Sequence, residues 1–190
     1  MNPNQSVRKV VIVGDHNVGK TCIIQRLIER RFNADTHPTI GSSTQTYHTT
    51  TTSGKPITMQ IWDTAGQEQY QSLSQVYFRN SQAAIVVFDA SIPNSVDKVV
   101  EWIHKYNEIV PNGFVAVVGN KSDKLRDLAE GKTQCLDIES EIDVPVSLVS
   151  ALNGDGIDNL FKYVADNIVD TVQPTHAPIV PATGNSGCSC

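Results

Sequence analysis

The features that this chain lacks exclude several classes of protein. None of its apolar runs approaches the length of a bilayer-spanning helix, and the polar residues 1–9 contain no signal-peptide core. The four cysteines show no zinc-ligand spacing, and a disulfide framework is not expected in a cytosolic protein of this size. A net charge of −5 argues against nucleic acid as a main partner. We therefore expect a cytosolic protein, whose 190 residues suffice for one domain with a buried core.

Short β-rich runs alternate with stretches of helical periodicity along most of the chain. The pattern predicts strands over 7–13, 45–52, 57–62, 83–88, 114–118 and 144–149, and helices over 20–31, 96–110 and 157–168. Strands that alternate with helices predict an α/β fold, in which a mostly parallel sheet has helices on both faces.

The last 18 residues differ in composition from the rest. From residue 173 onward the chain has three prolines, no Lys, Arg, Asp or Glu, and no periodicity. Such a composition is typical of a flexible tail. We therefore expect one domain over 1–172 and a tail over 173–190.

A glycine-rich segment follows the first expected strand. Residues 14–21 read Gly-Asp-His-Asn-Val-Gly-Lys-Thr and match the pattern G-x-x-x-x-G-K-[ST] between a strand and a helix. The glycines allow the backbone to curl so that amide N–H groups point at phosphate oxygens, and the helix N-terminus adds its positive end. Lys20 would reach the β- and γ-phosphates, and the Thr21 hydroxyl would bind Mg²⁺. This motif alone predicts a nucleotide site without specifying the base.

A second motif indicates the base. Residues 120–123 read Asn-Lys-Ser-Asp and follow the expected strand over 114–118. The carboxylate of Asp123 can accept from both N1–H and the exocyclic amino group of guanine, whereas adenine does not offer that pair of donors. A backbone N–H of Ser150 or Ala151 could meet the base oxygen. Guanine is therefore the expected base, and a kinase or another ATP-dependent enzyme is disfavoured.

The segment 61–68 carries the residues expected to act at the γ-phosphate. Asp63 stands at the end of a strand, where it can hold Mg²⁺ through a water, and the Gly66 amide can approach the γ-phosphate. Gln67 is placed to orient the attacking water. Upstream, the Thr39 hydroxyl can bind the metal only while a γ-phosphate holds its loop in place.

In order and spacing, these motifs resemble the Ras superfamily over about residues 7–170. The resemblance implies a small-GTPase fold with a six-stranded sheet and five helices, a Phe32 ring over the guanine, and two switch loops that contain Thr39 and Gln67. It implies catalysis by Lys20 and Gln67, and no arginine of the switch loops is placed as an internal finger, so an activating protein is needed. The predicted ligands of Mg²⁺ are Thr21, Thr39 and Asp63. The predicted GTP/GDP-binding residues are Gly14, Asp15, His16, Asn17, Val18, Gly19, Lys20, Thr21, Cys22, Phe32, Thr39, Gly66, Asn120, Lys121, Asp123, Ser150, Ala151 and Leu152.

Three features resemble the Rab family within this superfamily. Trp62 directly precedes Asp63, residues 70–79 carry a typical run, and the chain given ends in Cys188-Ser-Cys190. In Rabs such a terminus receives two geranylgeranyl groups, whereas a single-prenyl C-a-a-X box would need cysteine in place of Gly187. Two lipid chains attach a protein stably, and this tail has no basic residue that could supply a second signal.

The Rab resemblance also implies partners and a location. It implies a switch for vesicle and membrane trafficking that acts with an exchange factor, a GTPase-activating protein, a GDP-dissociation inhibitor and GTP-dependent effectors. Two prenyl groups would hold the chain, a monomer, on the cytoplasmic face of an intracellular membrane, with a cytosolic pool. The run over 81–89 is most similar to early-endosomal Rabs.

Three departures from the family pattern leave alternatives open. His16 stands where a small residue is usual, so it either crowds the γ-phosphate and slows hydrolysis or points to solvent. Thr44 replaces a phenylalanine of an effector-binding aromatic triad, and Leu152 replaces a lysine beside the guanine. A hydrolysing switch is therefore the main hypothesis, and a GTP-locked module that recruits effectors is the alternative.

Overall fold

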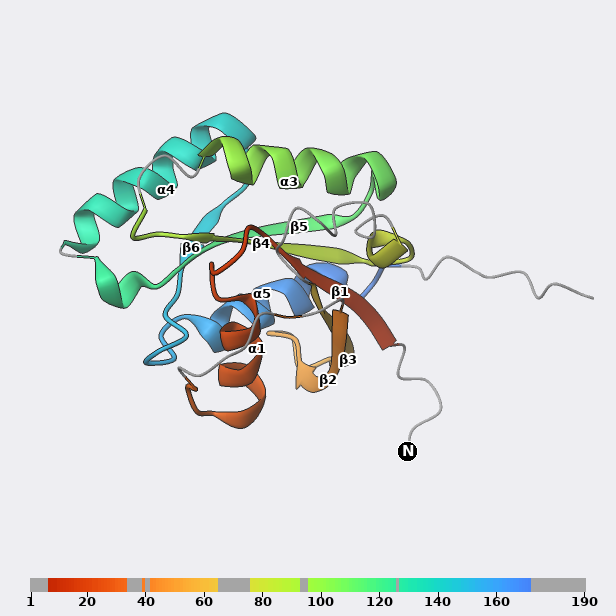
Figure 1. The fold of residues 1–190 in the computed structure, drawn as a ribbon. Helices are drawn as coiled ribbons and strands as arrows, with labels where there is room; N and C mark the ends of the chain where they lie inside the picture. Colours follow the sequence, from red (N-terminus) through yellow and green to blue (C-terminus); the bar gives the residue numbers. More distant parts are fainter. Residues whose placement is uncertain are drawn as a thin grey trace, which may run out of the picture.

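The computed structural model describes residues 7–33, 39, 42–64, 76–92, 96–125 and 127–171. A sheet lies between two pairs of helices, with α1 and α5 on one face and α3 and α4 on the other (Figure 1). The strands are β1 (Val7–Val13), β2 (Ser42–Thr50), β3 (Pro56–Thr64), β4 (Ala83–Asp89), β5 (Phe114–Asn120) and β6 (Val146–Leu148). The helices are α1 (Lys20–Glu29), α3 (Val96–Ile109), α4 (Leu128–Ile142) and α5 (Ile157–Ile168), with a short 3₁₀ helix, η2, over Ser122–Lys124.

The sheet has six strands in the order β2-β3-β1-β4-β5-β6. The pairs β1–β3, β1–β4, β4–β5 and β5–β6 are parallel, and the edge strand β2 runs antiparallel to β3. The expected α/β class with a mostly parallel six-stranded sheet is confirmed. None of the helices in the described ranges is long and apolar enough to cross a membrane.

Strand β1 shows why the central strands are continuous apolar runs. Val10 and Ile12 pack into the core cluster that also contains residues of α1 and α5, whereas Val11 and Val13 pack into the cluster with residues of α3 and α4. All four side chains are fully buried, because successive residues of a strand point to opposite faces and both faces are covered. Because most of the strands are parallel, their carboxyl ends meet at one edge of the sheet, where a ligand site is expected.

Five of the six strands differ from the sequence-based expectation by one to three residues at an end, and β2 and β6 show the reason. The strand predicted over 45–52 is β2, which begins at Ser42 because it pairs along the whole length of β3. The last strand was predicted over 144–149 but spans only Val146–Leu148, opposite Val117–Gly119 of β5. The boundaries of both strands are set by where they pair with the neighbouring strand, and the local apolar pattern gives no information about that neighbour.

The apolar periodicity of the sequence did not predict helix α4. Gly131 lies in its interior and Leu136 is 62% exposed, so the helix lacks a clean apolar stripe. A side chain at Gly131 would begin 2.4 Å from Leu125 Cδ1, the end of a flexible side chain, so it would require Leu125 to shift. Asp127 caps the helix, since its Oδ1 accepts a hydrogen bond from the Ala129 N–H at 2.8 Å.

Candidate functional site

The loop 14–19 joins β1 to α1 and takes a tightly curled path. The backbone is left-handed or nearly so at Gly14 (φ +138°), Asn17 (φ +59°) and Gly19 (φ +95°). A Cβ added at Gly14 would lie 2.1 Å from the Val87 carbonyl oxygen, and one at Gly19 would lie 2.3 Å from Asn120 Nδ2. Both glycines are therefore needed for the loop to approach β4 and β5.

Lys20 turns back into this loop. Its Nζ donates to the carbonyl oxygens of Gly14 at 2.8 Å and Asp15 at 2.7 Å, and the residue is only 6% exposed. Burial lowers the pKa of Lys20 to about 8, against the opposing charges of Asp63 and Asp15. An anion placed beside Nζ would offset the desolvation, so the loop 14–19, called the phosphate loop below, is suited to a phosphate.

Two hydroxyls and a carboxylate converge beside the loop. Thr21 Oγ1 donates to Asp63 Oδ2 at 2.7 Å, and Thr39 Oγ1 lies 3.0 Å from Thr21 Oγ1 and 3.4 Å from Asp63 Oδ2. Burial raises the pKa of Asp63, opposed by the Thr21 hydrogen bond and the Lys20 charge. The other carboxylate oxygen, Oδ1, is buried and has no hydrogen-bond partner among the residues that the structure describes.

The chemistry of this cluster agrees with Mg²⁺. Hydroxyl and carboxylate oxygens are hard donors, and Mg²⁺ commonly takes one or two such groups together with water and phosphate oxygens. Within the described ranges no group of three His, Cys, Asp or Glu side chains could hold a metal. The unpaired Asp63 Oδ1 is the acceptor that a metal-bound water would satisfy.

Asn120 connects the phosphate loop to the loop after β6. It is 1% exposed; its Nδ2 donates to the Val18 carbonyl at 2.8 Å, and its Oδ1 accepts from the Ala151 N–H at 3.1 Å. Lys121 Nζ donates to the Asn17 carbonyl at 2.6 Å. The expected Asn-Lys-x-Asp motif thus lies against the phosphate loop, about one hundred residues earlier in the chain.

The residues expected beside the base are held by several hydrogen bonds. Asp123 Oδ1 accepts a short hydrogen bond from Ser150 Oγ, which orients the carboxylate. The Ala151 N–H, one of the two that could meet the base oxygen, donates to Asn120 Oδ1, because that amide is fully buried and needs a donor. The Ser150 N–H donates to the Asp155 carbonyl at 3.0 Å. Phe32 is 37% and Leu152 is 49% exposed, and Cys22 on α1 is half-buried.

Sequence reasoning missed two residues that support these loops. Arg26 donates through Nε to the Ala151 carbonyl at 2.8 Å and through Nη2 to the Leu152 carbonyl. Asp89 forms a largely buried ion pair with Lys121 at 2.7 Å. Burial raises the pKa of Asp89, but hydrogen bonds from Lys121 and Ser91 outweigh burial, so the pKa is lowered. Asp89 stands at the carboxyl end of β4, and this position could have indicated that it belongs to the site. No feature of the sequence indicates the role of Arg26.

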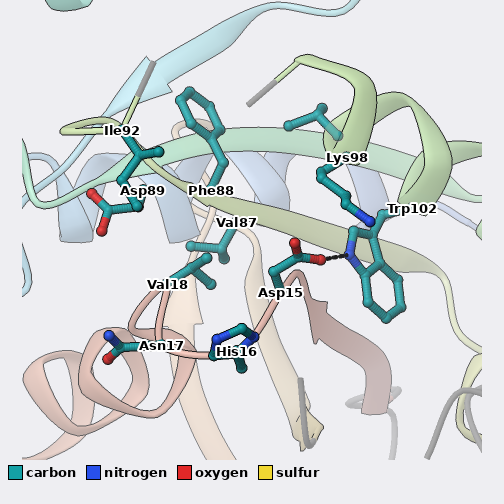
Figure 2. A pocket seen from close by; sticks show the side chains of 11 residues that line it. Asp15, His16, Asn17, Val18, Val87, Phe88, Asp89, Ile92, Lys98 and Trp102 are labelled. Carbon is teal, nitrogen blue, oxygen red and sulfur yellow. Dashed lines mark hydrogen bonds between the residues drawn. The ribbon is translucent and has the colours of Figure 1, made fainter. Parts of the chain in front are cut away.

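A cavity of about 260 Å³ lies between the phosphate loop and α3 (Figure 2). Asp15, His16 and Asn17 line it from the loop, and its other walls come from β4, the residues after β4, and α3. His16 is exposed, and the Asp15 carboxylate points toward α3. Whether His16 affects hydrolysis stays a prediction, because Gln67 lies outside the described residues.

Other predictions also concern residues that the structure does not describe. Gly66, Cys188 and Cys190 lie outside the described ranges, as do residues 70–75. The Thr44 departure can be located: Thr44 is paired with Trp62 across β2 and β3, and the ring of Trp62 lies 6.1 Å from that of Tyr77.

Comparisons with known proteins agree with this architecture. The model of the Ras family matches residues 9–170. Ras-related protein RabC of Dictyostelium discoideum is 30% identical over 168 residues, which are 87% of this chain and 85% of the relative. Ras-related protein Rab-19 of Mus musculus is 33% identical over 165 residues, or 85% and 75% of the two chains. Ras-related protein SEC4 of Saccharomyces cerevisiae is 30% identical over 169 residues, or 88% and 77%.

The fold and the site together define a guanine-nucleotide switch of the Ras superfamily. The mostly parallel sheet ends in a Lys-Thr loop, an Asp-Thr-Thr cluster and an Asn-Lys-x-Asp loop. Proteins of this class bind GTP and hydrolyse it. Within the class, the chain belongs to the Rab family of small GTPases. The comparisons give no support to the GTP-locked alternative.

Proposed function

We propose that this chain is a timed GTP switch for vesicle trafficking, slow on its own and accelerated by an activating protein. The observation that carries the proposal is the meeting of Thr21, Thr39 and Asp63 beside the buried Lys20. Residue 39 is about twenty positions from the phosphate loop in sequence, so its hydroxyl links a distant segment to the γ-phosphate side of the site. A contact of this kind can depend on the nucleotide state.

The phosphate loop and Lys20 would bind the triphosphate. Lys20 already donates to two loop carbonyls, so a phosphate oxygen would complete the set of acceptors around its ammonium. Thr21 and Thr39 would offer hydroxyl oxygens to Mg²⁺, with Asp63 acting through a water. Bound Mg²⁺ would supply positive charge that stabilises the leaving phosphate oxygens.

Asp123 would select guanine. Its carboxylate is held by Ser150, which supports a fixed orientation toward N1–H and the exocyclic amino group. Asn120 and Lys121 support this loop from the phosphate side through Val18 and Asn17. Adenine would leave the carboxylate without its two donors, which is the physical basis for discrimination.

Hydrolysis would depend on positioning. Gln67 would orient the attacking water, and Lys20 would neutralise charge that develops on the phosphate oxygens. With no arginine of the switch loops placed to add charge, the intrinsic rate is expected to be slow, and an activating protein would supply the missing group.

The switch would act on a membrane with the partners of its family. The names RabC, Rab-19 and SEC4 of its relatives support this assignment. Exchange factors, a GDP-dissociation inhibitor and effectors would read the two nucleotide states, and two prenyl groups on Cys188 and Cys190 would anchor the tail to an endosomal or another trafficking membrane.

Single-turnover phosphate release tests the proposal. Full-length protein is loaded with GTP, Mg²⁺ is added, and the released phosphate is followed over time. Protein incubated with ATP is the control for nucleotide selectivity, and Gln67→Leu is the control for hydrolysis. We expect release at roughly 10⁻⁴ to 10⁻³ per second, lost in Gln67→Leu and absent with ATP. Bound GTP without any released phosphate would contradict a timed switch.

A further inference from the structure

A side chain of α3 holds the phosphate loop from outside. The indole Nε1 of Trp102 donates to Asp15 Oδ1 at 3.0 Å, along the dashed line in Figure 2. The two residues are 87 positions apart and belong to different elements. A hydrogen bond to a carboxylate is stronger than one between neutral groups, so this contact can fix the position of the loop.

Asp15 is engaged at both its side chain and its main chain. Its carboxylate accepts from Trp102, and its carbonyl accepts from Lys20 Nζ at 2.7 Å. The residue before it, Gly14, packs so tightly on β4 that a Cβ would lie 2.1 Å from the Val87 oxygen. Movement of the Asp15 side chain therefore acts directly on the peptide that holds the Lys20 ammonium.

Trp102 is itself rigidly placed. It is 6% exposed and belongs to the core cluster formed by α3, β4 and α4. The Lys105 ammonium lies 5.1 Å from the centre of its ring, and Glu101 binds that ammonium at 2.6 Å. The indole can thus serve as a fixed donor for a loop that has to keep its shape.

An acidic side chain in a phosphate-binding loop needs such a donor. A free carboxylate one residue from the loop glycine could turn toward the bound phosphates, where like charges repel. In Figure 2 the Asp15 carboxylate points away from the loop, across the cavity toward α3. The indole N–H stabilises that orientation.

We propose that Trp102 is a positioning residue for nucleotide retention: it binds Asp15, keeps the carboxylate away from the phosphates, and holds the loop carbonyl that Lys20 contacts. The inference rests on the proposed function, because it assumes a guanine nucleotide at the phosphate loop. It adds α3 to the elements that set the lifetime of the bound nucleotide.

The first test compares the release of a fluorescent GDP analogue, in Mg²⁺ and excess unlabelled GDP, from full-length wild type and two variants. Trp102→Phe keeps an apolar ring but removes the donor. Tyr106→Phe is the matched control, because it removes a buried hydrogen bond (3.1 Å to Ser81) on the same helix without touching the phosphate loop. We expect Trp102→Phe to accelerate release about five- to tenfold and Tyr106→Phe to leave it within about twofold of wild type. Equal rates for the two variants would overturn the proposal.

A double-mutant cycle separates the contact from general loss of packing. Asp15→Ala and Trp102→Phe remove the same interaction, so the double variant is expected to release nucleotide no faster than the faster single variant. Asp15→Asn retains an oxygen acceptor and is expected to lie closer to wild type than Asp15→Ala. Fully multiplicative effects of the two single changes would overturn the proposal.

A spectroscopic readout does not depend on nucleotide affinity. The chain has two tryptophans, so a ¹H–¹⁵N spectrum has two indole signals, and Trp62→Phe assigns them. We expect Asp15→Ala to shift the Trp102 signal and to speed its hydrogen exchange, and an unchanged signal would overturn the inference. If wild type fails to bind the GDP analogue, the proposed function fails, and this measurement still decides whether Trp102 holds Asp15.

Discussion

Replacement of Gly19 by alanine tests the contact between the loop 14–19 and Asn120 at the end of β5. Gly19 has φ +95°, and an added Cβ would lie 2.3 Å from Asn120 Nδ2. That nitrogen donates to the Val18 carbonyl at 2.8 Å, so the new methyl group has to displace a buried hydrogen bond. Asn120 is 1% exposed and cannot turn toward water.

The magnitude follows from two separate costs. A left-handed backbone costs a residue with a Cβ about 1–2 kcal/mol. A buried polar group that loses its partner costs about 1–3 kcal/mol more. Gly54→Ala is the matched control, because Gly54 has φ +81° but nothing lies within 4 Å of its added Cβ.

We expect Gly54→Ala to lower the free energy of unfolding by about 1 kcal/mol and Gly19→Ala by about 3 kcal/mol. Urea unfolding followed by circular dichroism measures both in nucleotide-free buffer, where a change in GDP affinity does not contribute. Only Gly19→Ala is expected to weaken GDP binding, by about tenfold or more. Equal losses of stability in the two variants would refute the assumed collision with Asn120.

Three further predictions concern Lys20, His16 and the tail. Between about pH 8 and 10.5 the nucleotide-free folded protein binds fewer protons at Lys20 than the unfolded chain does, so this residue's contribution to the free energy of unfolding rises with pH through that window. A bound phosphate reverses the shift in the pKa of Lys20, so GDP affinity should fall above about pH 8. Calorimetry in two buffers at about pH 8.5 should detect that Lys20 takes up a proton on binding. A pH-independent affinity would contradict this. His16→Gly should accelerate single-turnover phosphate release about 10-fold if the imidazole displaces the attacking water, and an unchanged rate would dismiss that role. Replacing both Cys188 and Cys190 by serine should move the protein from the membrane pellet to the cytosolic fraction of cells, because no lipid chain remains; persistent pelleting would rule out the lipid anchor.

The sequence alone predicted the architecture and most of the candidate site. The continuous apolar runs of β1 and β4 identify strands that are covered on both faces, and the periodicity of α1 and α5 identifies the helices that cover one face. Glycine, lysine and a hydroxyl at fixed spacing predicted a curled loop suited to phosphate, and the backbone of residues 14–19 is tightly curled. These features could be predicted because their physical causes lie within a few residues of one another.

Helix α4 and the strand boundaries were beyond the sequence for a common reason. Gly131 weakens the helical pattern locally, and its close packing on Leu125 is visible only in the fold. The ends of β6 follow its pairing and are not set by the length of β5, since β6 pairs only with Val117–Gly119 although β5 spans Phe114–Asn120. Such features are set by neighbours that a local pattern does not contain.

The contacts that hold the site together were decided by the tertiary structure. The bonds from Trp102 to Asp15, from Lys121 to Asp89, and from Arg26 to the loop after β6 join residues between 32 and 126 positions apart. A sequence motif names the groups that would touch the nucleotide, because the ligand imposes their spacing. The residues that hold those groups in place can come from any element that the fold brings near, so their identity appears only when the chain has folded.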